Sequence, residues 1–237
     1  MMNSKNILCV IPARGGSKGI PYKNIKELDG KSLITYTIDI ARQLFDDEDI
    51  CVTTDDQQII DVVENNGLYV PFVRPHYLAT DEATTQDVLR HALDFYEQKG
   101  LFYDIILLLQ PTSPFRLKKH LEEAINLYTS NYDMVVSVKE TSANPYYNLF
   151  EEDGQGFLQI VKGDKIFTRR QDAPAVWEYN GSIYVINSKS LKTLMISDFS
   201  KKIKYPMENI YSIDIDTPLD WIIAEEVKKI LDYKIKG

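Results

Sequence analysis

Residues 6–24 read NILCVIPARGGSKGIPYKN, and this stretch decides the fold. The apolar run Ile7–Ile11 is typical of a buried strand, and it breaks at Pro12 into a basic, glycine-rich segment. Glycines let backbone amides approach an anion closely, and cations neutralise its charge. The stretch therefore predicts a strand followed by a phosphate-binding loop, whose cations are Arg14, Lys18 and Lys23.

The loop matches neither of the two common nucleotide motifs. It has no Gly-x4-Gly-Lys-Ser/Thr pattern and no Gly-x-Gly-x-x-Gly dinucleotide fingerprint. An ordinary solvated turn is the alternative interpretation. Three cations directly after a buried strand favour phosphate binding over that alternative.

Composition restricts the classes of partner. The chain has 237 residues, 44% of them hydrophobic, with a formal net charge of -8 and a pI near 5.0. A broad surface for nucleic acid or an anionic membrane needs clustered excess lysine and arginine. We therefore expect no nucleic-acid partner and no membrane partner, and the cations of the loop are local exceptions.

Cysteines, histidines and apolar runs bear on the redox state, on metal binding and on membrane insertion. Cys9 and Cys51 lie in apolar, strand-like runs, which is typical of buried reduced thiols. The three histidines show no metal-ligand spacing, and no apolar run approaches the length of a membrane span. These observations predict a cytoplasmic protein.

Strand and helix patterns alternate from residue 6 to about residue 138. This alternation predicts an α/β fold, a doubly wound and mostly parallel sheet, in one domain over residues 1–237. Ligands of such sheets bind at the carboxyl ends of the strands. Within this region strands are expected at 7–11, 49–55, 69–73, 104–109 and 134–138, and the core is expected to return with a strand at 181–186.

Several local signals refine this pattern. Either Asp81 or Thr84 is expected to cap the helix that follows, and Ser113 is expected to cap a helix with Pro114 at its first position. A last strand is expected over Tyr211–Asp216, followed by a closing helix that Thr217 caps.

Residues 139–179 interrupt the helical rhythm. Aromatic-rich pieces (146–150, 157–161 and 165–168) alternate with the turn signals Asp153-Gly154 and Gly163-Asp164. The segment predicts a β-hairpin excursion from the core. Because an exposed aromatic ribbon needs a partner, we interpret it as a dimer contact, so that the protein is a homodimer.

Two carboxylates near the end of the chain predict a metal site. Alternation along the expected strand places Asp214 and Asp216 on one face, about 6 to 7 Å apart. Such a pair suits Mg²⁺, which takes hard oxygen ligands and keeps positions open for phosphate oxygens. Helix capping by Thr217 and Asp220 is the alternative, but it does not account for Asp214.

Two further segments are ambiguous by themselves. Residues 110–116, QPTSPFR, build a strand-to-helix turn in the simplest interpretation, with Arg116 as a solvated first-turn residue. Asn180-Gly181 is equally a turn before a strand.

Together these segments resemble one family, the acylneuraminate cytidylyltransferases, also called CMP-sialic acid synthetases. The likeness spans nearly the whole chain and lies in four stretches, ARGGSKGIPYKN (13–24), LLQPTSPFR (108–116), NGSIY (180–184) and SIDIDTPLD (212–220). The CMP-Kdo synthetases are less similar, because their first loop has Ser-Thr-Arg where this chain has Ser-Lys-Gly.

The resemblance implies the reaction and the roles of residues. CMP would pass from CTP to the anomeric hydroxyl of a nonulosonic acid, with release of pyrophosphate. Catalytic roles fall to Arg14, Lys23 and Asp214, and Mg²⁺ would bind Asp214 and Asp216. The nucleotide would contact Arg14, Lys18, Lys23, Asn24 and Arg74. The sugar would contact Gln110, Asn180 and, from the partner's hairpin, Arg170.

One position departs from the family pattern. Some members carry an arginine two residues before the Asn-Gly pair, where this chain has Glu178. The sugar therefore stays open among N-acetylneuraminate, its deaminated form, legionaminate and pseudaminate. A catalytically inactive nucleotide-sugar-binding protein and a metal-dependent glycosyltransferase are the alternative functions.

Overall fold

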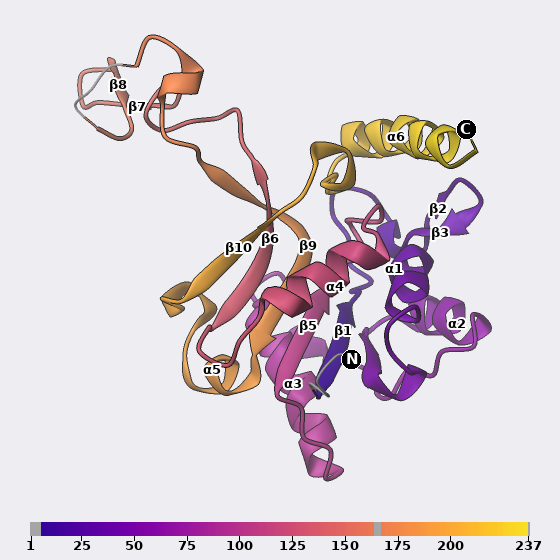
Figure 1. Cartoon of the computed structure of the whole chain (residues 1–237). Coiled ribbons are helices and arrows are strands. Elements are labelled where there is room, and N and C mark those ends of the chain that lie inside the picture. The colour runs from indigo at the N-terminus through magenta and orange to yellow at the C-terminus, as the bar shows by residue number, and fades with distance from the viewer. Residues whose placement is uncertain (1–5, 164–166, 237) are drawn as a thin grey trace.

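The computed structural model describes residues 6–163 and 167–236. Its centre is a six-stranded sheet in the order β10-β6-β9-β5-β1-β4 (Figure 1). The strands are β1 (Ile7–Pro12), β4 (Ile50–Thr53), β5 (Ile105–Leu109), β6 (Met134–Glu140), β9 (Trp177–Asn187) and β10 (Lys202–Pro206).

The sheet is mostly parallel, as predicted. β1 pairs in parallel with β4 and β5, and β10 pairs in parallel with β6. β9 alone runs antiparallel, to β5 on one side and β6 on the other. The prediction of a doubly wound α/β sheet is confirmed.

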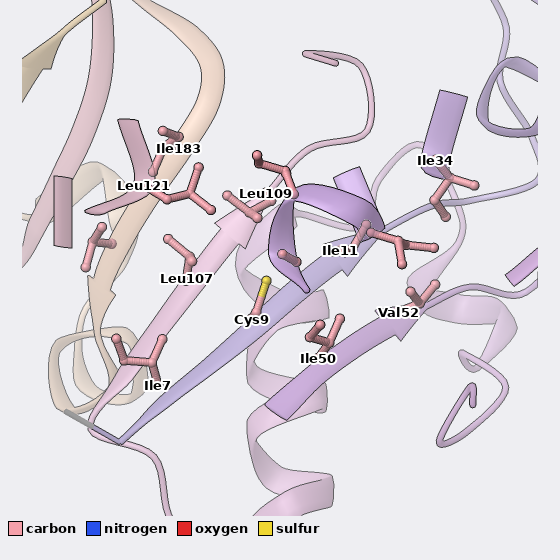
Figure 2. Close-up of a cluster of buried hydrophobic side chains, with 14 of the residues drawn as sticks. Ile7, Cys9, Ile11, Ile34, Ile50, Val52, Leu107, Leu109, Leu121 and Ile183 are labelled. Carbon is pink, nitrogen blue, oxygen red and sulfur yellow. The ribbon is translucent and has the colours of Figure 1, made fainter. Parts of the chain in front are cut away.

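Helices cover both faces of this sheet, and β1, β4 and β5 are accordingly buried on both of their faces. One apolar cluster packs α1 (Leu33–Ala41), α2 (Gln57–Asn65) and α4 (Lys118–Leu127) on the first face. Another packs α3 (Thr85–Gln98) and α5 (Ser188–Thr193) on the second. Figure 2 shows the first cluster, where Cys9 and Ile11 of β1 lie among side chains of the neighbouring strands.

The two cysteines are buried and free, as predicted. Burial raises the pKa of the Cys51 thiol to about 12 and that of Cys9 still further. Thiols in this state are poor nucleophiles. In the part of the chain that the structure describes, no helix is both long enough and apolar enough to cross a bilayer.

Two expected strands are wrong. Tyr69–Val73 forms only a single bridge, between Val73 and Thr54, because Pro71 has no N–H to donate and the segment lies beyond the edge strand β4. Residues 212–216 have no regular structure and follow a short 3-10 turn, η6 (Asn209–Tyr211). β10 forms an edge strand of the sheet instead, beside β6. Its Lys202 and Lys204 are typical of surface residues, so the sequence did not indicate a strand there.

The helix caps agree with the sequence in two of three cases. Thr84 caps α3 in a capping box with Asp87, and Thr217 pairs in the same way with Asp220 before α6 (Pro218–Lys236). Ser113 is not a cap, because α4 begins only at Lys118. Its hydroxyl donates to the carbonyl of Asn180 at 3.2 Å.

Between β6 and β9 the chain leaves the sheet and forms a separate hairpin, β7 (Phe150–Glu152) with β8 (Leu158–Ile160) (Figure 1). The predicted turn at Asp153-Gly154 closes it. The expected piece 165–168 and the turn at Gly163-Asp164 fall partly outside the described residues. Phe150, Phe157 and Leu158 are exposed. The dimer contact stays a prediction.

His120 makes the stability of the fold depend on pH. Its buried ring accepts a hydrogen bond from the Leu117 amide at 3.2 Å, and burial lowers its pKa to about 4. In the unfolded chain a histidine titrates near 6.5. Between those values the unfolded state binds more protons, so the free energy of unfolding should fall as the pH decreases from about 6.5 to 4, by on the order of 2 kcal/mol.

Urea unfolding of wild type and His120→Asn at pH 7.5, 5.5 and 4.5 tests this expectation. The variant should be less stable at pH 7.5, and the difference should shrink towards pH 4.5. The exposed His76→Asn is the matched control. A constant difference between wild type and His120→Asn would contradict the assignment.

Candidate active site

A pocket of about 420 Å³ opens at the carboxyl end of β1 and β5. The chain winds outward from β1 to β4 on one side and continues at β5 on the other, so the pocket lies at the switch point of the sheet. Five parts of the chain line it, namely the loop after β1, Arg74, residues 78–88 at the start of α3, the turn Gln110–Thr112 after β5, and Asp216.

The loop after β1 has the close approaches that its glycines allow. A Cβ at Gly19 would lie 2.1 Å from the carbonyl oxygen of Asp216, so only glycine fits there. The Gly15 amide donates to Asp55 Oδ1 at 3.1 Å, and the Asn24 side chain donates to the Arg14 carbonyl at 3.0 Å. The loop is therefore held on both sides, by the end of β4 and by the segment before α6.

The three loop cations each contact a carboxylate. Arg14 Nη1 lies 2.9 Å from Asp81 Oδ1, and Lys18 Nζ lies 2.5 Å from Asp81 Oδ2. Lys23 is buried, and its Nζ contacts Asp216 Oδ1 at 2.8 Å and the Ile215 carbonyl at 2.6 Å. All three side chains line the one pocket, as the sequence predicts for a phosphate-binding loop.

Arg74 brings a fourth cation to the pocket from the irregular segment after α2. It is buried, and its Nε donates to Thr53 Oγ1 at 3.1 Å while Nη2 donates to the Thr53 carbonyl. Burial lowers its pKa to about 10, against the field of Asp55, which raises it. The guanidinium is thus fixed on the end of β4.

Asp214 and Asp216 lie on irregular backbone, and of the two only Asp216 lines the pocket, whereas Asp214 lies beside Gly181. Asp214 is half-buried, and its Oδ1 has no hydrogen-bond partner among the described residues. Burial raises the pKa of this carboxyl, the Thr112 side chain opposes that shift, and the charge of Asp216 adds to it. Asp216 is exposed at the mouth of the pocket.

Gln110 and Asp214 both lie beside Gly181. A Cβ at that glycine would lie 2.8 Å from Asp214 Oδ2 and 3.2 Å from Gln110 Oε1, and the residue has φ +70. The turn after β5, the strand β9 and the segment before α6 therefore converge on one point.

This arrangement fits a magnesium ion. Mg²⁺ is commonly held by one or two carboxylates together with the oxygens of a substrate's phosphates. Asp214 and Asp216 supply that pair, and the orphaned Asp214 Oδ1 is an unused acceptor. Within residues 6–163 and 167–236 no group of three or more His, Cys, Asp or Glu side chains is assembled to hold a metal by itself.

Two predicted sugar ligands lie outside the pocket. Asn180 is buried, and its amide is used internally: Oδ1 accepts from Ser137 Oγ at 2.6 Å and Nδ2 donates to Ser212 Oγ at 2.9 Å. Arg170 is exposed in the 3-10 turn η4 (Arg170–Asp172) and contacts the Thr141 carbonyl. It lines a neighbouring cavity together with Glu178, whose carboxylate lies 3.6 Å from Lys139 Nζ.

The interpretation of Arg116 as a solvated residue is wrong. The side chain is only 3% exposed, and it donates from Nε to Ser182 Oγ at 3.1 Å and from Nη2 to the Gln110 carbonyl. Burial lowers its pKa to about 9. The role of Asp81 was also missed, since the sequence offers it only as a helix cap. The spacing of Asp81 from the loop gives no local signal of their contact.

The fold and the pocket define a class of protein, an α/β protein with a pocket at the switch point of its sheet that four cationic side chains line. The sequence profile of one family, described as Cytidylyltransferase, matches residues 8–236. The chain belongs to the cytidylyltransferase family.

Similar proteins agree with this assignment. The chain is 38% identical to the CMP-N,N'-diacetyllegionaminic acid synthase of Legionella pneumophila, over 94% of this chain and 97% of that protein. It is 30% identical to the pseudaminic acid cytidylyltransferase of Campylobacter jejuni, over 94% and 96%. It is 36% identical to the N-acylneuraminate cytidylyltransferase of Streptococcus agalactiae, over 91% of this chain but only 51% of that longer protein.

A solved structure shares the fold. The CMP-2-keto-3-deoxy-manno-octonic acid synthetase complexed with CTP aligns over 98% of this chain and 100% of its own, with a TM-score of 0.67 and 17% identity. At that identity the likeness concerns the fold alone.

The contact of Gly19 with Asp216 yields a test of the site's construction. Gly19→Ala should push the loop away from the segment before α6, because backbone cannot yield as a side chain does. Overpacking of this kind costs about 1–3 kcal/mol, or roughly 2 to 10 °C in melting temperature for a chain of this size. Gly16→Ala meets nothing within 4 Å and is the control in the same loop. Equal melting temperatures for the two variants would contradict the contact.

Proposed function

We propose that the protein transfers CMP from CTP to the anomeric hydroxyl of a nonulosonic acid and releases pyrophosphate. The observation that carries the proposal is the convergence of the loop cations and of Asp214 and Asp216 at one end of the sheet. The names of the relatives that match nearly the full chain agree with it.

The nucleotide side of the proposal uses the pocket's cations. Arg14, Lys18 and Lys23 would hold the triphosphate, and the fixed guanidinium of Arg74 would contact the cytidine or its phosphates. Asn24 acts through the Arg14 carbonyl, to which it donates, and so keeps the loop in shape. Such in-line positioning and charge neutralisation supply most of the catalysis in phosphoryl transfer.

The chemical step needs a base and a stabilised phosphate. The hydroxyl oxygen of the sugar bonds to the α-phosphorus, the bond from that phosphorus to the bridging oxygen breaks, and pyrophosphate leaves. Asp214 would take the proton of the hydroxyl, a task for which its raised pKa suits it. Lys23 would turn from Asp216 to the reacting phosphate.

The proposal includes magnesium. Asp214 and Asp216 would hold it, with one oxygen of each carboxylate available. When bound, the ion would neutralise charge on the phosphates.

One chain supplies fewer of the residues proposed to bind the sugar than of those proposed to bind the nucleotide. Gln110 lies beside Asp214 and would orient the sugar, whereas Asn180 would act by holding β9 against β6 and the Ser212 segment. We further propose a homodimer in which Arg170, which lies outside the pocket, serves the partner's sugar. The cytoplasmic location stays a prediction from the sequence.

Pyrophosphate release tests the function directly. Purified protein with CTP and Mg²⁺ should release pyrophosphate with at least one of N-acetylneuraminate, its deaminated form, legionaminate and pseudaminate. Omission of the sugar is the control for CTP hydrolysis. Silence with all four sugars, in protein that still binds CTP, would leave a nucleotide-binding protein without catalysis.

Asp214→Asn tests the acid pair. The variant keeps the shape but loses the charge and the proton acceptor, so turnover should fall at least about a hundredfold while the melting temperature and the elution volume are retained. Asp198→Asn, an exposed residue just before β10 at the opposite end of the sheet, is the control. Turnover by Asp214→Asn near the wild-type rate would mean that the base and the metal ligand lie elsewhere.

A further inference from the structure

Asp81 occupies the two outer cations of the phosphate-binding loop. Its Oδ1 lies 2.9 Å from Arg14 Nη1, and its Oδ2 lies 2.5 Å from Lys18 Nζ. Arg14 Nη1 also contacts the carbonyl of Thr80, the preceding residue. One carboxylate therefore bridges both cations, with one oxygen for each, as an oxyanion of the substrate would.

Because of the position of Asp81, this contact joins two segments of the chain that are far apart in the sequence. Asp81 lies on residues 79–84, between the 3-10 turn η3 (His76–Leu78) and the first residue of α3. The capping box of Thr84 with Asp87 anchors the far end of this segment. Residues of the segment and of the phosphate-binding loop line the same pocket, so the ion pairs join two of its walls.

The charges in the pocket do not permit Asp81 and a triphosphate to bind the same cations together. The charged side chains that line the pocket are Arg14, Lys18, Lys23, Arg74, Asp81 and Asp216. Both carboxylates among them are bonded to the loop cations. A triphosphate carries several negative charges, and a carboxylate left beside it is repelled at close range.

We propose that Asp81 is an internal counter-ion of the triphosphate site, which holds residues 79–84 against the loop after β1 until the triphosphate of the nucleotide displaces it. The proposal rests on the proposed function, in which Arg14 and Lys18 hold that triphosphate. Asp81 would thereby select for long phosphate chains, because a single phosphate reaches fewer of the cations and displaces the carboxylate less well.

If the triphosphate displaces Asp81, removal of the Asp81 carboxylate should strengthen the binding of the triphosphate. The ion pairs are exposed, with the Lys18 side chain 76% accessible, so each is weak. We expect Asp81→Asn to bind CTP and inorganic tripolyphosphate about three- to tenfold more tightly than wild type in metal-free buffer. Asp81→Glu, which keeps the charge, should bind both within about twofold of wild type.

Glu82→Gln is the matched control. It is the next residue, it is exposed, and it changes the net charge by the same amount without contacting Arg14 or Lys18 in the described structure. Its affinity for both probes should lie within about twofold of wild type. Titration calorimetry of the four proteins at low and high salt gives the comparison, and the gain in Asp81→Asn should shrink at high salt.

The outcomes separate this proposal from the proposed function. Equal or weaker binding by Asp81→Asn, with wild type binding CTP normally, would overturn the counter-ion and leave the function standing. An equal gain in Glu82→Gln would assign the effect to net charge and would also overturn it. If wild type binds neither CTP nor tripolyphosphate, the triphosphate site itself would be overturned.

Discussion

The close approach of Gly19 to the carbonyl of Asp216 is the contact on which the site depends. It brings the loop after the first strand against the segment before the last helix, and no side chain fits between them. Through this contact Lys23 reaches both Asp216 and the Ile215 carbonyl. Because backbone lies on both sides of this close approach, it sets the separation of the loop cations and Asp216 more rigidly than an ion pair between flexible side chains does.

The antiparallel strand β9 explains why the chain leaves the sheet between β6 and β9. It lies between β5 and β6, although it follows β6 in sequence, so the chain must reverse direction before it enters the sheet. The described residues between β6 and β9 lie outside the sheet, and the small β7–β8 hairpin is among them. A two-stranded hairpin is marginally stable by itself, which agrees with its proposed use as a contact between copies. The same insertion brings Gly181 to the point where Gln110 and Asp214 meet.

Two carboxylates bind the cations of the loop after β1. Asp81 bridges Arg14 and Lys18, and Asp216 binds Lys23, so each of the three loop cations has an anionic partner within the protein. The buried Arg116 links the turn after β5 to β9, since it donates to the Gln110 carbonyl and to Ser182. Under the proposed function, triphosphate binding would exchange one set of anions for another, so its net energy would be smaller than the number of ion pairs implies.

The sequence by itself determined the class of fold and the loop after β1 whose three cations line one pocket. Buried strands, helix periodicity and the caps Thr84 and Thr217 are local patterns, and local patterns are readable because hydrophobic burial and capping act between near neighbours. The tertiary structure alone decided that 212–216 is irregular, that Lys202–Pro206 is the edge strand, that Arg116 is buried, and that Asp81 binds Arg14. Each of these depends on contacts between distant segments, and the energy of such contacts comes from packing that no single segment specifies.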